Sequence, residues 1–234
     1  MEYHNLDLVQ VGPENWAFDR EHTWADILQK CSMNVSGIIH AGAHCGQELP
    51  AYIASGCREL LLFEPLRGPS EILVGWAGQL VGMTPGLNIS IEKKALGSSN
   101  GTGSMDVSSN GGQSSSLLKA KEHLDMCPSV VFGEPEEVTI TTLDDYDTSK
   151  YNTLVLDCQG YEAEIIKGAT KSLDNIDYVF TELNIQELYE GCPLIEDMDA
   201  LLASHDLIRV SYIQEGLGFG TGIYIKRKFL KVNV

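Results

Sequence analysis

Short apolar runs alternate with amphipathic stretches along this chain, and no other feature constrains its fold as strongly. Residues 35–42 (VSGIIHAG) are typical of a buried strand, residues 47–56 predict a helix that stops at Gly56, and residues 58–65 (RELLLFEP) predict a second strand. Consecutive strands joined by a helix lie parallel and form right-handed crossovers, with helices over both faces of the sheet. We therefore expect an α/β fold.

The same alternation continues to the C-terminus. Residues 207–229 contain two strands around a glycine-rich turn, which predicts an antiparallel hairpin. The patterns together predict a Rossmann-like, seven-stranded, mostly parallel sheet with helices on both faces. The other core strands are expected within residues 87–97, 152–157 and 176–184, a further strand within 136–146, and the other helices within 69–82, 161–173 and 195–206.

The 234 residues suffice for one domain with a large core. Trp24, Ile27, Leu28 and Cys31 are spaced three to four apart, which predicts an amphipathic helix ahead of the first strand. We therefore divide the chain into an N-terminal helical extension, residues 1–34, and a main domain, residues 35–234.

Residues 97–116 are rich in Gly, Ser and Asn. Two interpretations stay open for this segment. It is either a surface hairpin that turns at Asn110, Gly111 and Gly112, or a polar lid over a ligand.

Charge and cysteine content indicate which partners, metal sites and compartments suit this chain. The chain has 33 acidic and 16 basic residues and a formal charge of -17, which disfavours a nucleic-acid partner. The six cysteines lack the spacing of a zinc site, and we interpret them as free thiols in a reducing compartment. No run of 18 apolar residues occurs. We expect a cytoplasmic protein without a membrane partner.

Polar residues follow several of the predicted strands, at the edge where ligands of doubly wound sheets bind. The turn HAGAHCGQE contains the small residues Gly42, Ala43 and Gly46, which let a ligand approach the backbone closely. Glu64 follows the second strand, at the distance where an acid grips both hydroxyls of a ribose. This combination predicts a nucleoside cofactor.

The glycine pattern of the turn is not specific. GxGxxG, the fingerprint of dinucleotide-binding folds, is absent because Gly42 and Gly46 are separated by AHC. A nucleotide-dependent oxidoreductase is therefore disfavoured. The usual methyltransferase turn is not met either, because His40 and His44 stand where an acid and a glycine are expected.

Six segments in order resemble the FkbM-type methyltransferase family. They are IIHAGAHCGQE, LLFEP, KKALGSSNG, TTLDDY, LVLDCQGYEAEIIKGA and FTELNIQELYEG, within roughly residues 35–210, and LDCQGYEAEIIKGA is the most specific. The resemblance implies a class I methyltransferase fold, with S-adenosylmethionine as cofactor. It also implies methyl transfer to an oxygen, often on a sugar or a secondary metabolite.

The resemblance assigns roles to individual residues. It places the turn at 42–46 around the methionine part of the cofactor and makes Glu64 the acid that binds the ribose. Asp157 would lie beside the methionine amino group or the acceptor, and His40 replaces an acid at the ammonium end. The implied cofactor-binding set is His40, Gly42, Ala43, His44, Gly46, Glu64, Ala95, Leu96 and Asp157.

Asp157 and Glu182 are the candidate catalytic residues, because they end two strands expected to be neighbours. With Asn184 they offer three oxygen donors, the kind of ligand that Mg²⁺ or Mn²⁺ prefers. Such a cation would hold two vicinal hydroxyls and lower the pKa of the attacked one. Alternatively, Asp157 binds only the cofactor and Glu182 hydrogen-bonds a turn. Candidate substrate contacts are Gln159, Glu162 and Ser115.

We therefore predict an S-adenosylmethionine-dependent O-methyltransferase that acts on a small polyhydroxylated acceptor, with a sugar or glycan as the favoured class. Two alternatives stay open, a catalytically inactive nucleoside-binding module and the nucleotide-dependent oxidoreductase.

Overall fold

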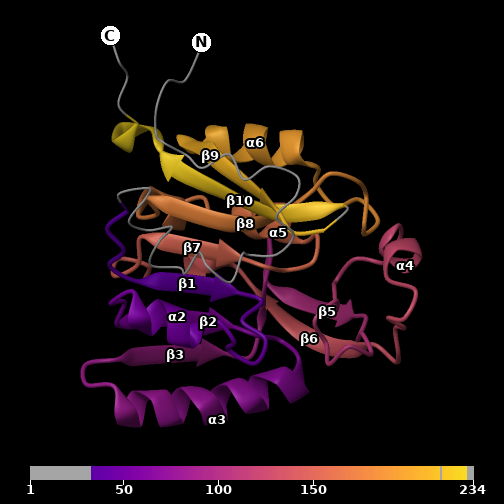
Figure 1. Ribbon diagram of the computed structural model, residues 1–234, viewed down its shortest axis with the longest axis horizontal. Coiled ribbons are helices and arrows are strands. Elements are labelled where there is room, and N and C mark those ends of the chain that lie inside the picture. Colours follow the sequence, from indigo (N-terminus) through magenta and orange to yellow (C-terminus); the bar gives the residue numbers. More distant parts are fainter. Residues whose placement is uncertain (1–32, 217, 231–234) are drawn as a thin grey trace.

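The computed structural model describes residues 33–216 and 218–230. The predicted helical extension, residues 1–34, lies almost entirely outside the described residues. Within the described residues, the main sheet has seven strands in the order β3-β2-β1-β7-β8-β10-β9 (Figure 1). Their bounds are β1 Ile38–Ala41, β2 Glu59–Phe63, β3 Asn88–Glu92, β7 Thr153–Leu156, β8 Tyr178–Asn184, β9 Leu207–Gln214 and β10 Phe219–Lys226.

Strand directions agree with the sequence pattern. β1 pairs in parallel with β2 and β7, β2 with β3, and β7 with β8, whereas β10 is antiparallel to both β8 and β9. The predicted seven-stranded, mostly parallel sheet with a C-terminal antiparallel hairpin is confirmed. Because the parallel strands share one direction, the residues that follow them meet at one edge of the sheet.

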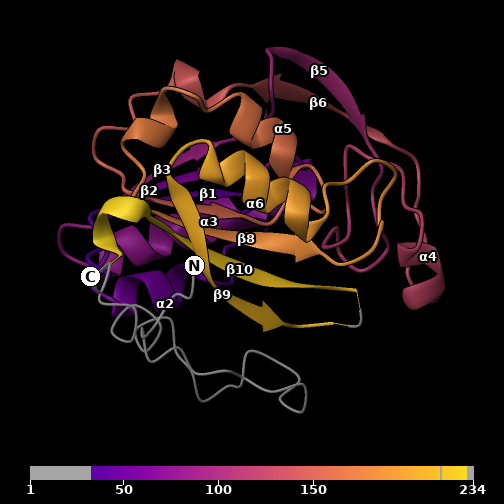
Figure 2. The same cartoon turned by 90° about the horizontal axis from the view of Figure 1, so that it is seen from above.

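Helices cover both faces of the sheet (Figure 2). On one face, α2 (Leu49–Ala54) and α3 (Arg67–Met83) bury Tyr52 and Leu73 against alternate strand residues such as Leu60. On the other face, α5 (Glu162–Lys167) and α6 (Ile195–Ala203) bury Ile166 and Met198. Ile38 and Ile39 pack into opposite cores, which explains why β1 carries apolar residues on both of its faces.

A second, three-stranded sheet extends from the main one. It has the order β4-β6-β5, with β4 Ala95–Leu96, β5 Gly101–Met105 and β6 Glu136–Thr141. The stretch 87–97, expected to hold one strand and its exit turn, holds two strands, because Ala95 and Leu96 pair with Ile140 and Thr141 outside the main sheet. The short helix α4 (His123–Met126) lies beyond this sheet.

The segment 106–116 turns where the sequence predicts. Asp106 and Ser116 form an antiparallel bridge, and Gly111 and Gly112 adopt positive φ angles of 78° and 94° between them. Only glycine adopts such angles routinely. Among residues 33–216 and 218–230, no helix has the length and apolar character that crossing a membrane requires.

Candidate functional site

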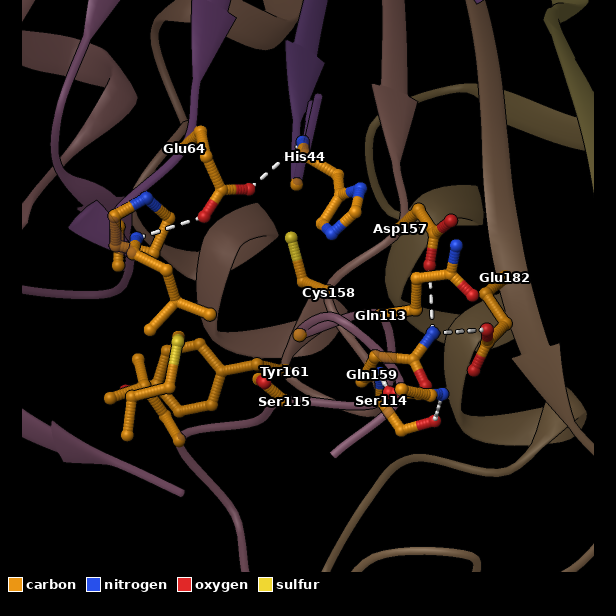
Figure 3. Close-up of a pocket in the computed structure, with 18 of the residues that line it drawn as sticks. His44, Glu64, Gln113, Ser114, Ser115, Asp157, Cys158, Gln159, Tyr161 and Glu182 are labelled. Atoms are coloured by element: carbon orange, nitrogen blue, oxygen red, sulfur yellow. Dashed lines mark hydrogen bonds between the residues drawn. The ribbon is translucent and has the colours of Figure 1, made fainter. Parts of the chain in front are cut away.

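A cavity of about 400 Å³ opens at the edge of the main sheet where the parallel strands end (Figure 3). Its walls come from the turns after β1, β2 and β7, from the end of β8 and the segment after it, from β4, from residues within 105–127, and from Glu215 and Phe219 at the β9–β10 turn. The strand order reverses at β1, between β2 and β7, which is where doubly wound sheets bind ligands. The volume falls within the range of about 300–1,000 Å³ typical of ligand sites.

The turn after β1 forms one end of the cavity, together with Glu64. Gly42 has a φ of 81°, and a Cβ atom there would lie 1.8 Å from the carbonyl oxygen of Asp157. Gly42 and His44 line the cavity, whereas Ala43 is buried in the core. Gly46 packs against Leu49 and Leu73 behind the turn, so it shapes the turn without lining the cavity.

Glu64 is fixed by two backbone amides. Its Oε2 accepts from the N–H of His44 at 2.9 Å and its Oε1 from the N–H of Leu66 at 2.8 Å. Burial raises the pKa of Glu64, while these hydrogen bonds act in the opposite direction. The carboxylate lines the cavity beside Ala95 and Leu96, so the structure brings these three predicted cofactor residues together.

His40 lies apart from the cavity. Its ring is 3% exposed and packs under the turn, with Nδ1 3.2 Å from the hydroxyl of Tyr52. Burial lowers the pKa of His40 to about 4, so the ring is neutral at pH 7. Its Nε2 has no hydrogen-bond partner within the described chain. The structure therefore makes His40 a core residue, in contrast to the predicted cofactor contact.

Asp157, Gln159, Glu182 and Glu215 form what we call the carboxylate end of the cavity. Gln159 Nε2 donates to Asp157 Oδ1 and to Glu182 Oε2, both at 2.9 Å (Figure 3). Desolvation by the cavity walls raises the pKa of Asp157. The pKa of Glu182 rises well above its usual value through desolvation and then through repulsion by Asp157, Glu162 and Glu215.

Glu162 holds the turn after β7 from below. Its Oε1 accepts from the backbone N–H groups of Cys158 at 2.8 Å and Gly160 at 3.3 Å. The side chain is fully buried and does not line the cavity, which differs from the predicted substrate contact. Burial raises the pKa of Glu162. We infer that Glu162 maintains the turn that carries Asp157 and Gln159.

The segment 106–116 closes the cavity opposite the sheet. Ser115 lines the cavity, but its Oγ also accepts from the N–H of Ser108 at 3.0 Å. His44 Nε2 donates to the carbonyl oxygen of Gly111 at 2.8 Å, which joins the segment to the turn after β1. The segment is thus both a hairpin and a wall of the cavity, so neither of the two interpretations excludes the other.

The three predicted metal ligands do not converge. Asn184 is 1% exposed and does not line the cavity, because its side chain is buried at the end of β8. The side-chain NH₂ group of Gln159 lies between Asp157 and Glu182, where a bridging cation would have to sit. No three His, Cys, Asp or Glu residues form a potential metal site in the part of the chain that the structure describes. The residues present therefore do not fit the predicted three-donor site.

Residues 40–208, most of the described chain, match the family described as Methyltransferase FkbM domain. This chain belongs to the FkbM methyltransferase family. The resemblance expected from the sequence is thereby confirmed. Glu64, Asp157, Gln159 and Glu182 lie inside the matched FkbM range, whereas Glu215 lies beyond it.

Two known proteins illustrate the similarity. The 2-O-methyltransferase NoeI from Sinorhizobium fredii (strain NBRC 101917 / NGR234) is 34% identical over 100 residues, 41% of each chain. The crystal structure of Methyltransferase FkbM from Methylobacillus flagellatus KT superposes with a TM-score of 0.56 at 12% identity, over 81% of this chain and 43% of that one. This chain spans less than half the length of either relative. The superposition confirms the predicted class I methyltransferase fold.

Glu215 and His123 are among the polar residues of the cavity that sequence reasoning missed. Glu215 follows β9, which runs parallel to β8, so strand direction alone would place it at the same edge. His123 lies on the four-residue helix α4, which has no hydrophobic periodicity to reveal it. Its Nε2 lies 3.0 Å from Ser114 Oγ, and burial lowers its pKa.

Proposed function

We propose that this protein binds S-adenosylmethionine in the cavity and transfers the methyl group to a hydroxyl of a small polyhydroxylated acceptor, a sugar or glycan. One observation carries the proposal: a single cavity joins a glycine turn and a fixed acid at one end to a carboxylate end at the other. Membership of the FkbM methyltransferase family supports it.

The glycine turn and Glu64 suit the cofactor. The carboxylate of Glu64 keeps lone pairs for the two hydroxyls of a ribose while two backbone amides hold it in place. Ala95, Leu96 and the ring of Tyr161 line the cavity nearby and offer apolar contact to an adenine. Bound S-adenosylmethionine supplies a methyl group on a positively charged sulfur.

The carboxylate end suits an uncharged acceptor. Asp157, Glu182 and Glu215 present acceptor oxygens, and the hydroxyl groups of a sugar are donors. The cavity walls carry five carboxylates and one lysine, Lys94, which already pairs with Glu92 at 2.9 Å. An anionic acceptor would be repelled. The name of NoeI, a 2-O-methyltransferase, supports oxygen as the methylated atom.

Asp157 and Glu182 are the groups available to take the proton of the attacking hydroxyl. Transfer of the methyl group from bound S-adenosylmethionine to the acceptor oxygen would break the carbon–sulfur bond, leave its electron pair on sulfur and release the hydroxyl proton. The hydroxyl proton passes to whichever of the two groups is ionised; desolvation raises the pKa of both, which makes the ionised form a stronger base. General base catalysis contributes about 10²- to 10⁴-fold, and alignment of the reacting atoms supplies further acceleration.

Methyl transfer to a panel of neutral sugars and oligosaccharides, with cofactor labelled in the methyl group, tests the proposal. We expect label in at least one sugar product. The competing hypothesis of an inactive nucleoside-binding module predicts binding of S-adenosylhomocysteine, the demethylated product, and no labelled sugar. The oxidoreductase hypothesis predicts binding of NAD instead.

The metal dependence predicted from the sequence is a separate point. Mg²⁺ or Mn²⁺ would have to displace the Gln159 amide from between Asp157 and Glu182. Transfer measured after exhaustive EDTA treatment decides it. Full activity would exclude the metal-dependent mechanism, and loss that Mn²⁺ restores would establish it.

A further inference from the structure

Tyr189 is a fully buried residue behind the carboxylate end. It lies between β8 and α6, is 0% exposed and does not line the cavity. Its hydroxyl lies 2.9 Å from Gln159 Oε1 and 2.9 Å from the carbonyl oxygen of Ser114. Both neighbours are acceptors, so the single phenolic proton is donated to one or shared between them.

The amide of Gln159 has one favourable orientation. Its NH₂ group donates to Asp157 and Glu182, so its Oε1 points the other way, toward Tyr189. A reversed amide would place Oε1 against two carboxylates and leave the phenolic proton without the Oε1 acceptor. The backbone of Gln159 is also constrained, with a φ of 54° and a carbonyl oxygen that accepts from Ser116 Oγ at 2.8 Å. A non-glycine residue in this region is often a functional one.

Asp157 and Glu182 depend on this amide. They come from different strands, and their negative charges repel each other. Gln159 donates to one oxygen of each, which leaves Asp157 Oδ2 and Glu182 Oε1 for a ligand. Two such oxygens, one on each carboxylate, suit an acceptor that presents two neighbouring hydroxyls.

We propose that Tyr189 is a positioning residue that acts through Gln159 to hold Asp157 and Glu182 together at the carboxylate end. This inference rests on the proposed function and extends it to a residue outside the cavity walls. The alternative is that Tyr189 only packs with Leu188 and Cys192. The Tyr189→Phe variant separates the two roles, because it keeps the ring and removes the hydroxyl.

Tyr224 provides the matched control. It is also 0% exposed, and its hydroxyl donates to Asp199 Oδ1 at 2.8 Å, away from the cavity walls. Tyr224→Phe therefore removes one buried tyrosine hydrogen bond without touching Gln159. Thermal unfolding of both variants checks that each is folded at the assay temperature.

The first measurement needs no acceptor. Nuclear magnetic resonance follows the exchange of the Gln159 side-chain NH₂ protons with deuterated water, with Gln159→Ala identifying their signals. We expect exchange to be faster by at least about tenfold in Tyr189→Phe, because the amide is no longer held. Tyr224→Phe should retain the wild-type rate. Unchanged exchange in Tyr189→Phe would overturn the proposal.

The second measurement is kinetic. Tyr189→Phe should lower kcat roughly fivefold to tenfold while KM for S-adenosylmethionine stays within about twofold, because the cofactor contacts lie elsewhere. The double variant Tyr189→Phe, Gln159→Ala should be no slower than Gln159→Ala alone, because Tyr189 acts through Gln159. If the double variant combined the kcat losses of both single variants, Tyr189 would not act through Gln159. If the wild type methylates no sugar, the proposed function fails, and the exchange experiment still decides the role of Tyr189.

Discussion

Glu64 and Asp157 are held in the cavity by different means, and this difference suits different tasks. Two backbone amides fix Glu64, so its oxygens keep one position whatever ligand is present. Asp157 shares a side-chain amide with Glu182, which ties its orientation to the rest of the carboxylate end. A rigid acceptor suits ribose binding, and a coupled pair suits proton transfer.

Glu64→Ala should weaken binding of S-adenosylhomocysteine by at least about tenfold, because hydrogen bonds to a charged group contribute about 1.5–3 kcal/mol. Calorimetry measures the dissociation constant. Glu71→Ala, on the exposed side of α3, is the control and should bind as the wild type does. If folded Glu64→Ala bound S-adenosylhomocysteine with the dissociation constant of the wild type, the ribose would have to lie elsewhere.

Asp157→Asn should lower kcat by about 10²- to 10⁴-fold, because an amide cannot take the acceptor proton. The affinity for S-adenosylhomocysteine should change much less than kcat. Single-turnover transfer of labelled methyl to the best sugar acceptor measures the chemical step. Asp147→Asn, at the opposite edge of the sheet, should be as fast as the wild type, and a fast Asp157→Asn would assign the proton to Glu182 alone.

At the scale of elements, the cavity turn joins β1 to α2, and the buried ring of His40 packs beneath it. Burial lowers the pKa of His40 from its ordinary 6.5 to about 4. The unfolded chain therefore takes up this proton first as the pH falls. The contribution of neutral His40 to the free energy of unfolding is therefore complete above about pH 6.5. It decreases by about 1.4 kcal/mol per pH unit as the pH falls toward 4.

Replacing His40 should remove this pH dependence. Between pH 6.5 and pH 5, the wild type should lose about 2 kcal/mol more free energy of unfolding than His40→Gln does. Urea unfolding at the two pH values measures this change in the free energy of unfolding. The buried carboxylates change it with pH in the opposite direction, but they do so equally in both proteins, so their effect cancels in the comparison. His205→Gln is the control and should lose as much as the wild type. Equal losses in wild type and His40→Gln would contradict the burial of a neutral ring.

Elements with a clear apolar run were predictable, and those without one were not. β1, β2, β7 and β8 are buried on both faces, so each contains a run of apolar residues without polar alternation. β5 contains glycines and exposed polar residues, and its place beside β6 depends on pairing between distant segments. The second sheet was therefore missed.

The same distinction applies to the site. Glu64, Asp157 and Glu182 were found because each lies at the end of a recognisable strand, Glu64 and Asp157 directly after β2 and β7 and Glu182 among the last residues of β8. Tyr189 and His123 belong to segments without periodicity, so only the folded chain shows what they contact. His40 was predicted at the cofactor but lies in the core away from the cavity walls, because the position of a residue on a strand does not show which side chains the core encloses.

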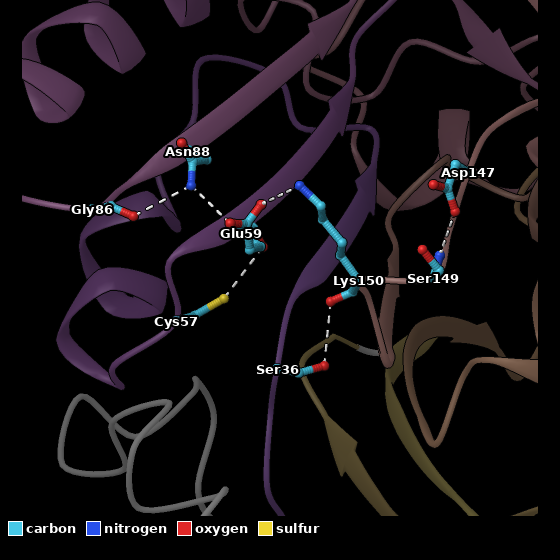
Figure 4. A network of polar contacts seen from close by, with 8 residues as sticks. All are labelled: Ser36, Cys57, Glu59, Gly86, Asn88, Asp147, Ser149 and Lys150. Atoms are coloured by element: carbon cyan, nitrogen blue, oxygen red, sulfur yellow. Dashed lines mark hydrogen bonds and ion pairs between the residues drawn. The ribbon is translucent and has the colours of Figure 1, made fainter.

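At the scale of the whole molecule, the two edges of the main sheet differ in how their charges are satisfied. At the edge away from the cavity, Glu59 accepts from Asn88 Nδ2 at 2.7 Å and pairs with Lys150 at 3.8 Å (Figure 4). Ser36 Oγ donates to the carbonyl oxygen of Lys150, which joins the start of β1 to the start of β7. At the cavity edge, Asp157, Glu182 and Glu215 have no basic side chain as an ion-pair partner among the described residues.

This charge distribution predicts selection by acceptor charge. With a formal charge of -17 and an acidic cavity, the protein should methylate a neutral sugar with a kcat/KM at least about tenfold above that of its uronic acid. Raising NaCl from about 10 mM to about 500 mM should bring the two kcat/KM values closer together, because salt screens the repulsion between the cavity and the uronic acid. If kcat/KM for the uronic acid at low salt equalled or exceeded that for the neutral sugar, the assignment of the carboxylate end to the acceptor would be contradicted.

The most direct test of the whole account is a crystal structure with S-adenosylhomocysteine. We predict that the ribose hydroxyls lie within hydrogen-bond distance of Glu64, the adenine lies beside Leu96, and the sulfur faces Asp157. A complex with the ligand outside this cavity, or with its ribose away from Glu64, would contradict the account.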